Sequence, residues 1–184
     1  MPRLLNAADY RVMPWKNGGG TTSEILIAPP GAHMASFDWR ISMARIDQDG
    51  DFSCFPGVDR TLTVLSGAMS LRVAEGERQQ LNAISPPYGF PGECEVAAEV
   101  ERGSVHDLNV FTRRTAFSHE VWRHAATAPL PPRREGSIRL IMPTTNGSIP
   151  FEAPNCLMFA QDEPLASLGG LTDHASVIAD IWRV

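Results

Sequence analysis

Three stretches of the chain carry side chains that could bind or transform a small molecule. The first is the glycine run Gly18–Gly20, with Lys16 and Asn17 before it and Thr21 after it. Consecutive glycines let backbone N–H groups converge on an anion, and Lys16, the only lysine of the chain, would add positive charge. The lysine precedes the glycines, which excludes the phosphate-binding loop of nucleotide hydrolases, and a plain hairpin turn is the favoured alternative.

The second stretch centres on Arg60. This residue shares strand parity with Leu62 and Val64, so its guanidinium is expected on the apolar side of a strand and at least half buried. A guanidinium presents a rigid fork of donors that suits a carboxylate. The alternative is an ordinary surface ion pair with Asp59 or Asp38.

The third stretch runs from Ser104 to Arg114. In an extended strand, Asp107, Asn109 and Arg113 lie on one face. Such a polar face either contacts solvent or lines a wet pocket, and parity alone favours solvent.

The elements that must position these residues are short strands. The 15 Gly and 15 Pro leave apolar runs of about four to nine residues, which is typical of an all-β sandwich or barrel. Helical character is confined to Glu163–Leu171, where two glycines interrupt it. The expected strands are Ser23–Ala28, Phe37–Ile46, Thr61–Leu65, Ala68–Val73, Glu95–Val100, Ser104–Thr112, Ala116–Trp122, Ser137–Met142, Leu157–Ala160 and Val177–Val184.

Composition limits the size of the fold and the class of partner. With 184 residues and 43% hydrophobic content, the chain suits one compact unit. A formal net charge of -5 provides no basic surface for nucleic acid or for a membrane anchor. The cysteines form no CxxC pair, and no apolar run has the length of a leader or a membrane span, so a cytoplasmic protein is expected.

Two segments resemble the cupin motifs but lack their metal ligands. Arg60, followed by six residues and Gly67, stands where the first motif has a glutamate, and in Pro87–Gly92 the last glycine replaces the histidine of the second motif. The two other histidine positions fall on one of two pairs, Ser53 with Phe55 or Cys54 with Pro56. A metal needs several convergent donors, and an arginine favours anions instead. The resemblance therefore implies a cupin without a metal or other cofactor.

In their order and spacing, four motifs closely resemble the HutD/Ves family. They are Trp15–Thr21, Trp39–Ala44, Phe52–Leu62 and Asp107–Asn109. The resemblance implies an all-β, cupin-like β-barrel in a bicupin arrangement, that is, an antiparallel β-sandwich or jelly roll. It implies a single compact unit over residues 1–184, with the main barrel and its pocket in 1–124 and a smaller second barrel completed by 135–184.

The same resemblance implies a site and a role. The pocket residues carried over are Lys16, Asn17, Thr21, Arg40, Ser42, Arg60, Asp107 and Asn109. The family is associated with bacterial histidine utilisation, has no established catalytic activity, and is proposed to bind a pathway acid such as formylglutamate or urocanate. The expected partner is a small anionic metabolite, with no nucleic acid and no membrane. Pairing into a homodimer stays open, because edge strands leave little sequence signature.

Three functional hypotheses follow from these residues. The leading one is a non-enzymatic binder in which Arg60, with Arg40, holds carboxylate oxygens while the two asparagines orient amide or formyl groups. The second is a cofactor-independent isomerase or hydrolase with Asp107 as general base and Arg60 stabilising negative charge. The third is a metal-dependent cupin that recruits Cys54 and a distant histidine.

Overall fold

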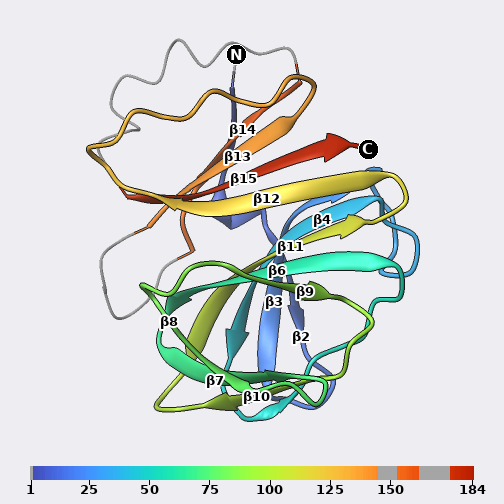
Figure 1. Cartoon of the computed structure of the whole chain (residues 1–184), viewed down its shortest axis with the longest axis vertical. Helices are drawn as coiled ribbons and strands as arrows, with labels where there is room; N and C mark the ends of the chain where they lie inside the picture. The colour runs from blue at the N-terminus through green and yellow to red at the C-terminus, as the bar shows by residue number, and fades with distance from the viewer. Residues whose placement is uncertain (1, 145–152, 162–174) are drawn as a thin grey trace.

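Three antiparallel β-sheets lie one above another in the computed structural model (Figure 1). The structure describes residues 2–144, 153–161 and 175–184, so the expected helical segment Glu163–Leu171 lies outside the described residues. The described residues form fifteen strands and a single 3₁₀ turn, Ala7–Asp9. No helix in these ranges is long and apolar enough to cross a membrane.

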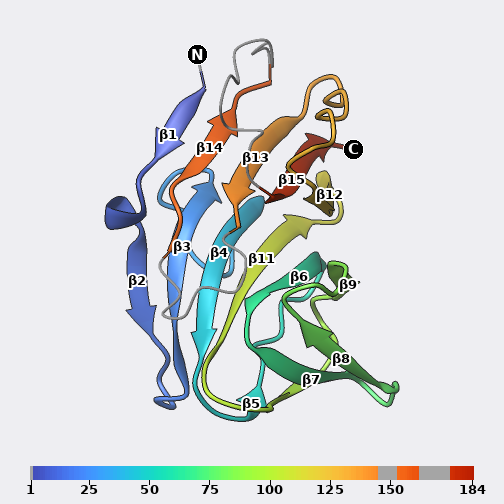
Figure 2. The same cartoon turned by 90° about the vertical axis from the view of Figure 1, so that its left-hand side faces the viewer.

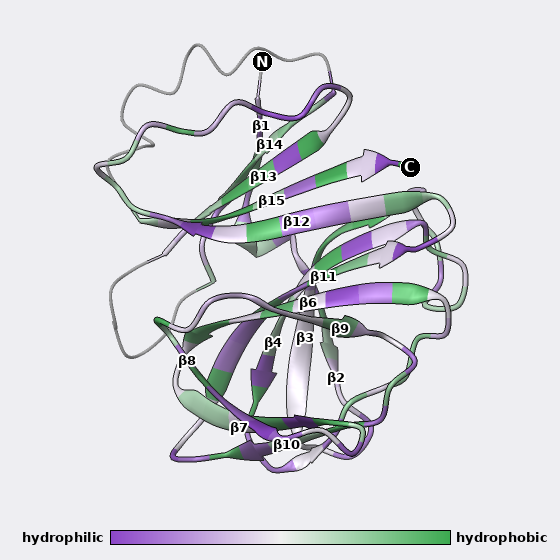
Figure 3. Cartoon of the chain, in the orientation of Figure 1, coloured by the Kyte–Doolittle hydropathy of each residue, from purple (hydrophilic) through white to green (hydrophobic). Residues whose placement is uncertain are grey.

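The central sheet has the strand order β2-β3-β4-β11-β6-β9. Its strands are β2 (Arg11–Pro14), β3 (Gly20–Ala28), β4 (Trp39–Ile46), β6 (Val58–Ser66), β9 (Tyr88–Pro91) and β11 (Val105–Arg113). Figure 3 shows hydrophilic stretches within this sheet, β6 among them.

The two outer sheets are named from their places in Figure 1. The lower sheet, of order β5-β10-β7-β8, contains β5 (Gly50–Asp51), β7 (Ala68–Val73), β8 (Arg78–Asn82) and β10 (Val96–Val100). The upper sheet, of order β1-β14-β13-β15-β12, contains β1 (Arg3–Leu5), β12 (Phe117–His124), β13 (Ile138–Pro143), β14 (Cys156–Phe159) and β15 (Ser176–Arg183). Figure 2 shows β1 and β2 following each other along one side of the molecule.

The central sheet is covered on both faces, and β4 shows how. Trp39, Ile41 and Met43 belong to the core shared with the upper sheet, whereas Ala44 and Ile46 belong to the core shared with the lower sheet. Successive side chains of a strand point to opposite faces, so one strand contributes to both cores. Seven of the eight residues of β4 are buried as a result. Polar residues on the lower-facing side are therefore also removed from bulk solvent.

The expected all-β, cupin-like fold is confirmed. All ten expected strands are present, Ala68–Val73 with the predicted ends and the others with one or both ends shifted. The missed strands β1, β2, β5, β8 and β9 have five residues or fewer. Such short, mostly peripheral strands bury too few residues to show an apolar run. The division into a barrel over 1–124 and a second over 135–184 stays a prediction. In the described chain, β1 and β12 pair directly with the C-terminal strands.

Candidate functional site

A pocket of about 550 Å³ opens on the lower-facing side of the central sheet. Its floor is made by β4 and β11, because Asn109 is paired with Ser42 and Phe111 with Arg40. Its walls come from the loop between β2 and β3 and from residues 51–55, which start at the last residue of β5. The pocket therefore collects residues from all four motifs, although Arg60 itself does not line it.

The glycine run makes a hairpin turn between β2 and β3, which is the alternative that the sequence favoured. The N–H of Gly18 donates to the carbonyl of Trp15 at 3.1 Å, and that of Gly19 donates to Oδ1 of Asn17 at 3.0 Å. Gly18 has a φ of +72°, and a Cβ on Gly20 would lie 2.2 Å from the carbonyl oxygen of Arg45. The glycines are thus needed for the turn and for close packing against β4, and they place Lys16 and Asn17 on the pocket wall.

Thr21, which the family resemblance carried over to the pocket, lies on the opposite face of β3. On β3, Thr21 pairs with Arg45, whereas Thr22 pairs with Ala44, which lines the pocket. Thr22 is therefore the threonine on the wall, and its hydroxyl accepts a hydrogen bond from Nε1 of Trp15 at 2.8 Å. The register between β3 and β4 decides between the two threonines, and a single strand does not reveal it.

Arg40 is the buried cation of the pocket. Only 3% of it is exposed, and it lines the pocket from β4. Its Nε donates to Oε2 of Glu24 at 2.8 Å and its Nη1 to the hydroxyl of Ser42 at 3.2 Å. No residue in the described ranges accepts a hydrogen bond from its Nη2. Arg40 is thus held in place from one side and keeps a donor for a ligand.

Arg60 lies behind the pocket wall and holds Asn109. Its Nε and Nη2 donate to Oδ1 of Asn109 at 2.9 and 2.6 Å. The amide Nδ2 of Asn109 in turn donates to Oδ1 of Asp107 at 2.7 Å, and the backbone N–H of Ala44 donates to the same oxygen at 3.2 Å. These contacts fix the orientation of the Asn109 amide, so Arg60 and Asp107 act on the pocket through Asn109.

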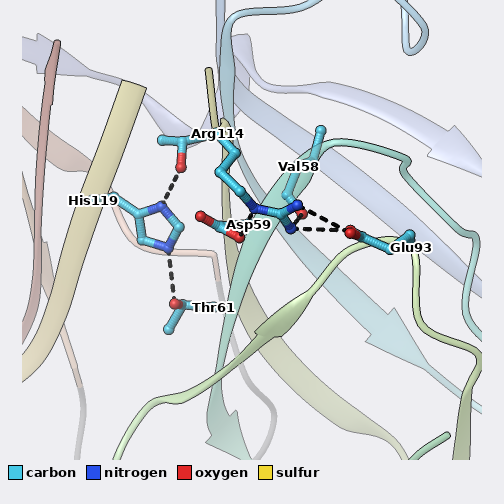
Figure 4. Close-up of polar contacts among 7 residues, drawn as sticks. Val58, Asp59, Thr61, Glu93, Arg114 and His119 are labelled. Atoms are coloured by element: carbon cyan, nitrogen blue, oxygen red, sulfur yellow. Dashed lines mark hydrogen bonds and ion pairs between the residues drawn. The ribbon is translucent and has the colours of Figure 1, made fainter. Parts of the chain in front are cut away.

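The surroundings of Arg60 confirm its burial and exclude the surface alternative. It is 7% exposed, and its guanidinium carbon lies 4.5, 5.1 and 5.3 Å from the ring centres of Phe52, Phe111 and Phe90. Asp59 pairs with Arg114 at 2.8 Å (Figure 4), and Arg60 has no ion pair with any described residue. A guanidinium among phenyl rings is stabilised by cation–π attraction.

The solvent-facing prediction for β11 is wrong. Asp107 is fully buried and Asn109 is 2% exposed, because the lower sheet and the segment that follows β5 cover this face. Burial raises the pKa of Asp107 to about 6, although the charge of Arg60 and the hydrogen bond from Asn109 oppose the rise. Burial also lowers the pKa of Arg60 to about 10. Arg60 is therefore charged at neutral pH, whereas Asp107 changes charge near pH 6.

Asp107 does not reach the wall of the pocket, so the geometry gives no support to it as a base in contact with substrate. Its Oδ2 is buried without a hydrogen-bond partner among the described residues. A buried carboxylate oxygen without a donor is costly when charged, which agrees with the raised pKa. Asp107 lies beneath the pocket floor, where its Oδ1 accepts hydrogen bonds from Asn109 and Ala44.

The residues at the cupin metal positions do not fit a metal. A Cβ at Gly92 would lie 2.9 Å from the carbonyl oxygens of Phe55 and Val58, so no histidine side chain has room there. Arg60 contributes a positive charge at the glutamate position. Within the described ranges, no three His, Cys, Asp or Glu side chains gather as metal ligands. Elemental analysis of the purified protein tests the metal-free prediction directly.

The structure separates the eight predicted residues into three groups. Lys16, Asn17, Arg40, Ser42 and Asn109 line the pocket, Arg60 and Asp107 lie behind it, and Thr21 lies on the other face of β3. Sequence reasoning missed Glu24, which anchors Arg40, and the aromatic walls Trp15, Phe52, Phe55 and Phe111. Phe52 and Phe55 lie beside Ser53, one of the residues at a cupin histidine position, and all three line the pocket. Their closeness to that position in the sequence could have identified the two phenylalanines as pocket residues. Ligand binding by these residues stays a prediction.

Comparison with known proteins identifies similar chains. A family model described as HutD matches residues 7–171. An uncharacterized 21.2 kDa protein in the hutC 3' region of Pseudomonas putida is 38% identical over 109 residues, 59% of this chain and 57% of that protein. Protein Ves of Citrobacter koseri is 39% identical over 112 residues, 58% of this chain and 56% of that protein. The matches thus span a little over half the length of these curated relatives.

Two solved structures share the fold. HutD from Pseudomonas fluorescens SBW25 has a TM-score of 0.77 at 23% identity, with 100% of each chain covered. A conserved protein of unknown function from Pseudomonas aeruginosa PAO1 has a TM-score of 0.73 at 25% identity, with 100% of this chain and 98% of that chain covered.

Proposed function

The chain belongs to the HutD family, and we propose that its pocket binds a small carboxylate intermediate of histidine degradation, with a regulatory role in histidine utilisation. Formylglutamate and urocanate are the leading ligands. A cytoplasmic location is part of this proposal. The relative from the hutC 3' region of Pseudomonas putida supports the link to this pathway.

The observation that carries the proposal is the buried guanidinium of Arg40 on the pocket wall. Glu24 and Ser42 accept two of its donor groups, and Nη2 has no acceptor in the described chain. A fixed guanidinium forms strong, directional hydrogen bonds to a carboxylate. Because its partners already hold it in place, little side-chain freedom is lost when a ligand binds.

Further polar groups around Arg40 suit an acid. Lys16 lies on the exposed wall, and the hydroxyl of Ser42 and the amide of Asn109 lie on the floor. Asp51 is the only acidic residue among the described lining residues. The wall thus carries two cations and one carboxylate, although the chain has a net charge of -5. Glu24 pairs with Arg40 from outside this lining, so the charges around the pocket balance, and Lys16 and the Nη2 of Arg40 are the cationic groups that remain for an anion.

The aromatic walls indicate the rest of the ligand. Trp15, Phe52, Phe55 and Phe111 border the same pocket. Flat aromatic side chains bury apolar or unsaturated groups well. We therefore expect an acid with a flat, unsaturated body, such as urocanate, to bind more tightly than formate, which has only its carboxylate.

Calorimetric titration with urocanate, formylglutamate, glutamate and formate tests the proposal. At least one of the larger acids should bind saturably and more tightly than formate. No heat with any of them at millimolar concentration would contradict the proposal. Incubating the same acids with the protein and following their consumption separates a binder from an enzyme, since the binder leaves the acids unchanged.

A further inference from the structure

A second pocket, of about 540 Å³, lies on the upper sheet, on the face turned away from the central sheet. Ala179 and Ile181 of β15 pack into the core shared with the central sheet, so Asp180 and Trp182 point to the opposite face. Asp180 pairs with Glu120 of β12 and with Arg139 of β13. These three charged residues form a row across the sheet, and the proline-rich segment 131–134 borders it.

Two of the arginines in this pocket hold the proline-rich segment in place. Arg139 is 1% exposed, and its Nε and Nη2 each donate to a carboxylate oxygen of Asp180 at 2.7 Å. Its Nη1 donates to the carbonyl of Pro131 at 2.7 Å. Arg133 donates from both terminal nitrogens to the carbonyls of Ala160 and Gln161. The guanidinium nitrogens of Arg139 and the terminal nitrogens of Arg133 thus already donate to groups of the protein itself.

Two charged side chains of the pocket, one of each sign, are exposed and have no hydrogen bond in the described chain. Arg134 is exposed, and its guanidinium carbon lies 4.4 Å from the ring centre of Trp182. Stacking uses the face of a guanidinium and leaves its N–H edge able to donate. Glu120 is also exposed, and neither residue has an ion pair with any residue that the structure describes. Arg139 already neutralises Asp180, so Glu120 and Arg134 are the pocket's unused carboxylate and guanidinium.

Two half-buried indoles complete the pocket. Trp122 lies two residues beyond Glu120 on β12, and Trp182 lies two residues beyond Asp180 on β15. Since these strands are antiparallel, the indoles flank the charged row on opposite sides. They offer flat apolar surface beside a carboxylate and a guanidinium.

From this arrangement we infer that the second pocket binds a zwitterionic α-amino acid with a flat side chain. The carboxylate of the ligand pairs with Arg134, which stays stacked on Trp182, its ammonium group pairs with Glu120, and its ring packs against Trp122 on the other side of the charged row. A simple anion or cation would use only one of the two unused charges. This site is separate from the proposed carboxylate pocket and does not depend on it.

An NMR titration with L-phenylalanine tests the inference on the full chain. The four tryptophans give four indole N–H signals, which Trp→Phe variants assign. The ligand should shift the signals of Trp122 and Trp182. The signal of Trp15, which borders the carboxylate pocket, should stay in place. A shift of Trp15 alone would place the amino acid in the other pocket and overturn the inference.

Matched ligands and variants then separate the two charges. N-acetyl-L-phenylalanine lacks the ammonium group, phenethylamine lacks the carboxylate and L-alanine lacks the ring, so each should bind about tenfold more weakly or worse. Glu120→Gln should weaken phenylalanine binding about tenfold and leave N-acetylphenylalanine binding unchanged. Arg134→Gln should weaken phenylalanine binding similarly and leave phenethylamine binding unchanged. Equal losses for all ligands, or no loss in either variant, would refute the pairing.

A further control separates this inference from the proposed function. Arg40→Gln alters the carboxylate pocket and should leave phenylalanine binding at the second pocket unchanged. Both exposed positions tolerate glutamine without loss of buried contacts, so thermal unfolding of Glu120→Gln and Arg134→Gln should match that of the wild type. A negative binding result at one pocket therefore does not change the interpretation of the result at the other pocket.

Discussion

Arg40 and Arg60 are both buried arginines close to the same pocket, yet their donors are used differently. Arg60 gives Nε and Nη2 to one oxygen of Asn109 and lies among three phenyl rings. Arg40 keeps Nη2 for the pocket. The sequence pattern placed Arg60 first because it occupies a cupin ligand position. In the proposed function, the direct contact with the acid therefore falls to Arg40, and Arg60 positions Asn109.

Replacing Arg40 should therefore remove ligand affinity. Arg40→Gln is expected to weaken binding of the acid by about 10- to 100-fold, because a charged hydrogen bond contributes about 1.5–3 kcal/mol. It also leaves Glu24 without its partner, which lowers the free energy of unfolding. The double variant Arg40→Gln with Glu24→Gln should recover stability but not affinity. Calorimetry and denaturant unfolding measure the two effects, and an unchanged Kd in Arg40→Gln would count against the assignment.

Protonation of Asp107 should strengthen anion binding. Its pKa of about 6 lies above its ordinary value of 3.8, so the carboxylate loses its charge as the pH falls through 6 while Arg60 stays charged. Affinity for an acid with no titrating group between pH 5 and 8 should rise severalfold from pH 7.5 to pH 5.5. Asp107→Asn should bind with an affinity independent of pH. A wild type without pH dependence would contradict this linkage.

For each strand, the alternation of side chains between its two faces predicted that only one face is buried. It correctly placed Arg60 with Leu62 and Val64 inside the fold. It failed for Asp107, because the elements that cover this face of β11 are remote in sequence and no property of the strand itself reveals them. Thr21 was carried over by the family resemblance instead, and the register of β3 with β4 places its neighbour Thr22 beside the pocket. The strands could thus be predicted from the local sequence pattern, whereas the burial of both faces of the central sheet could not.

The turn between β2 and β3 depends on one glycine more than on its neighbour. A Cβ at Gly20 would lie 2.2 Å from a backbone oxygen of β4, whereas one at Gly19 would be 3.4 Å from the side chain of Asn17. Gly20→Ala should lower the free energy of unfolding by about 3 kcal/mol, since the backbone of β4 must move. Gly19→Ala is the matched control and should change it by less than about 1 kcal/mol. Equal effects in urea unfolding would show that the close approach is unimportant.

His119 connects the upper sheet to the central sheet. Its ring lies between the hydroxyls of Thr112 and Thr61, at 2.7 and 2.8 Å (Figure 4). Burial lowers the pKa of His119 from 6.5 to about 4, so folding favours the neutral ring. The stabilisation is fully present above pH 6.5 and is lost as the pH falls towards 4.

A variant without this imidazole should be less sensitive to acid. Between pH 7 and pH 4, the unfolding free energy of the wild type should fall by about 2 kcal/mol more than that of His119→Gln, a value reduced for the partial exposure of the ring. Denaturant unfolding at several pH values measures the difference. Parallel curves for the two proteins would show that His119 does not contribute to acid sensitivity.

For the whole molecule, the proposed function requires an acidic chain to bind an anion. The net charge of -5 repels anions at long range, whereas Arg40 and Lys16 attract them at the pocket. Selection must then come from short-range contacts with a carboxylate. The upper sheet supports this arrangement from the other side, because it covers the apolar face of β4 and β11 and so holds the pocket floor in place.

The most direct test of this central claim compares an acid with its own ester. The tightest-binding acid from the titration series and its methyl ester differ in charge at the carboxylate but hardly in shape. Calorimetric titration of the wild-type protein should show saturable binding of the acid and binding of the ester at least tenfold weaker. Equal affinity for acid and ester, or no binding of any acid, would contradict a carboxylate-binding pocket.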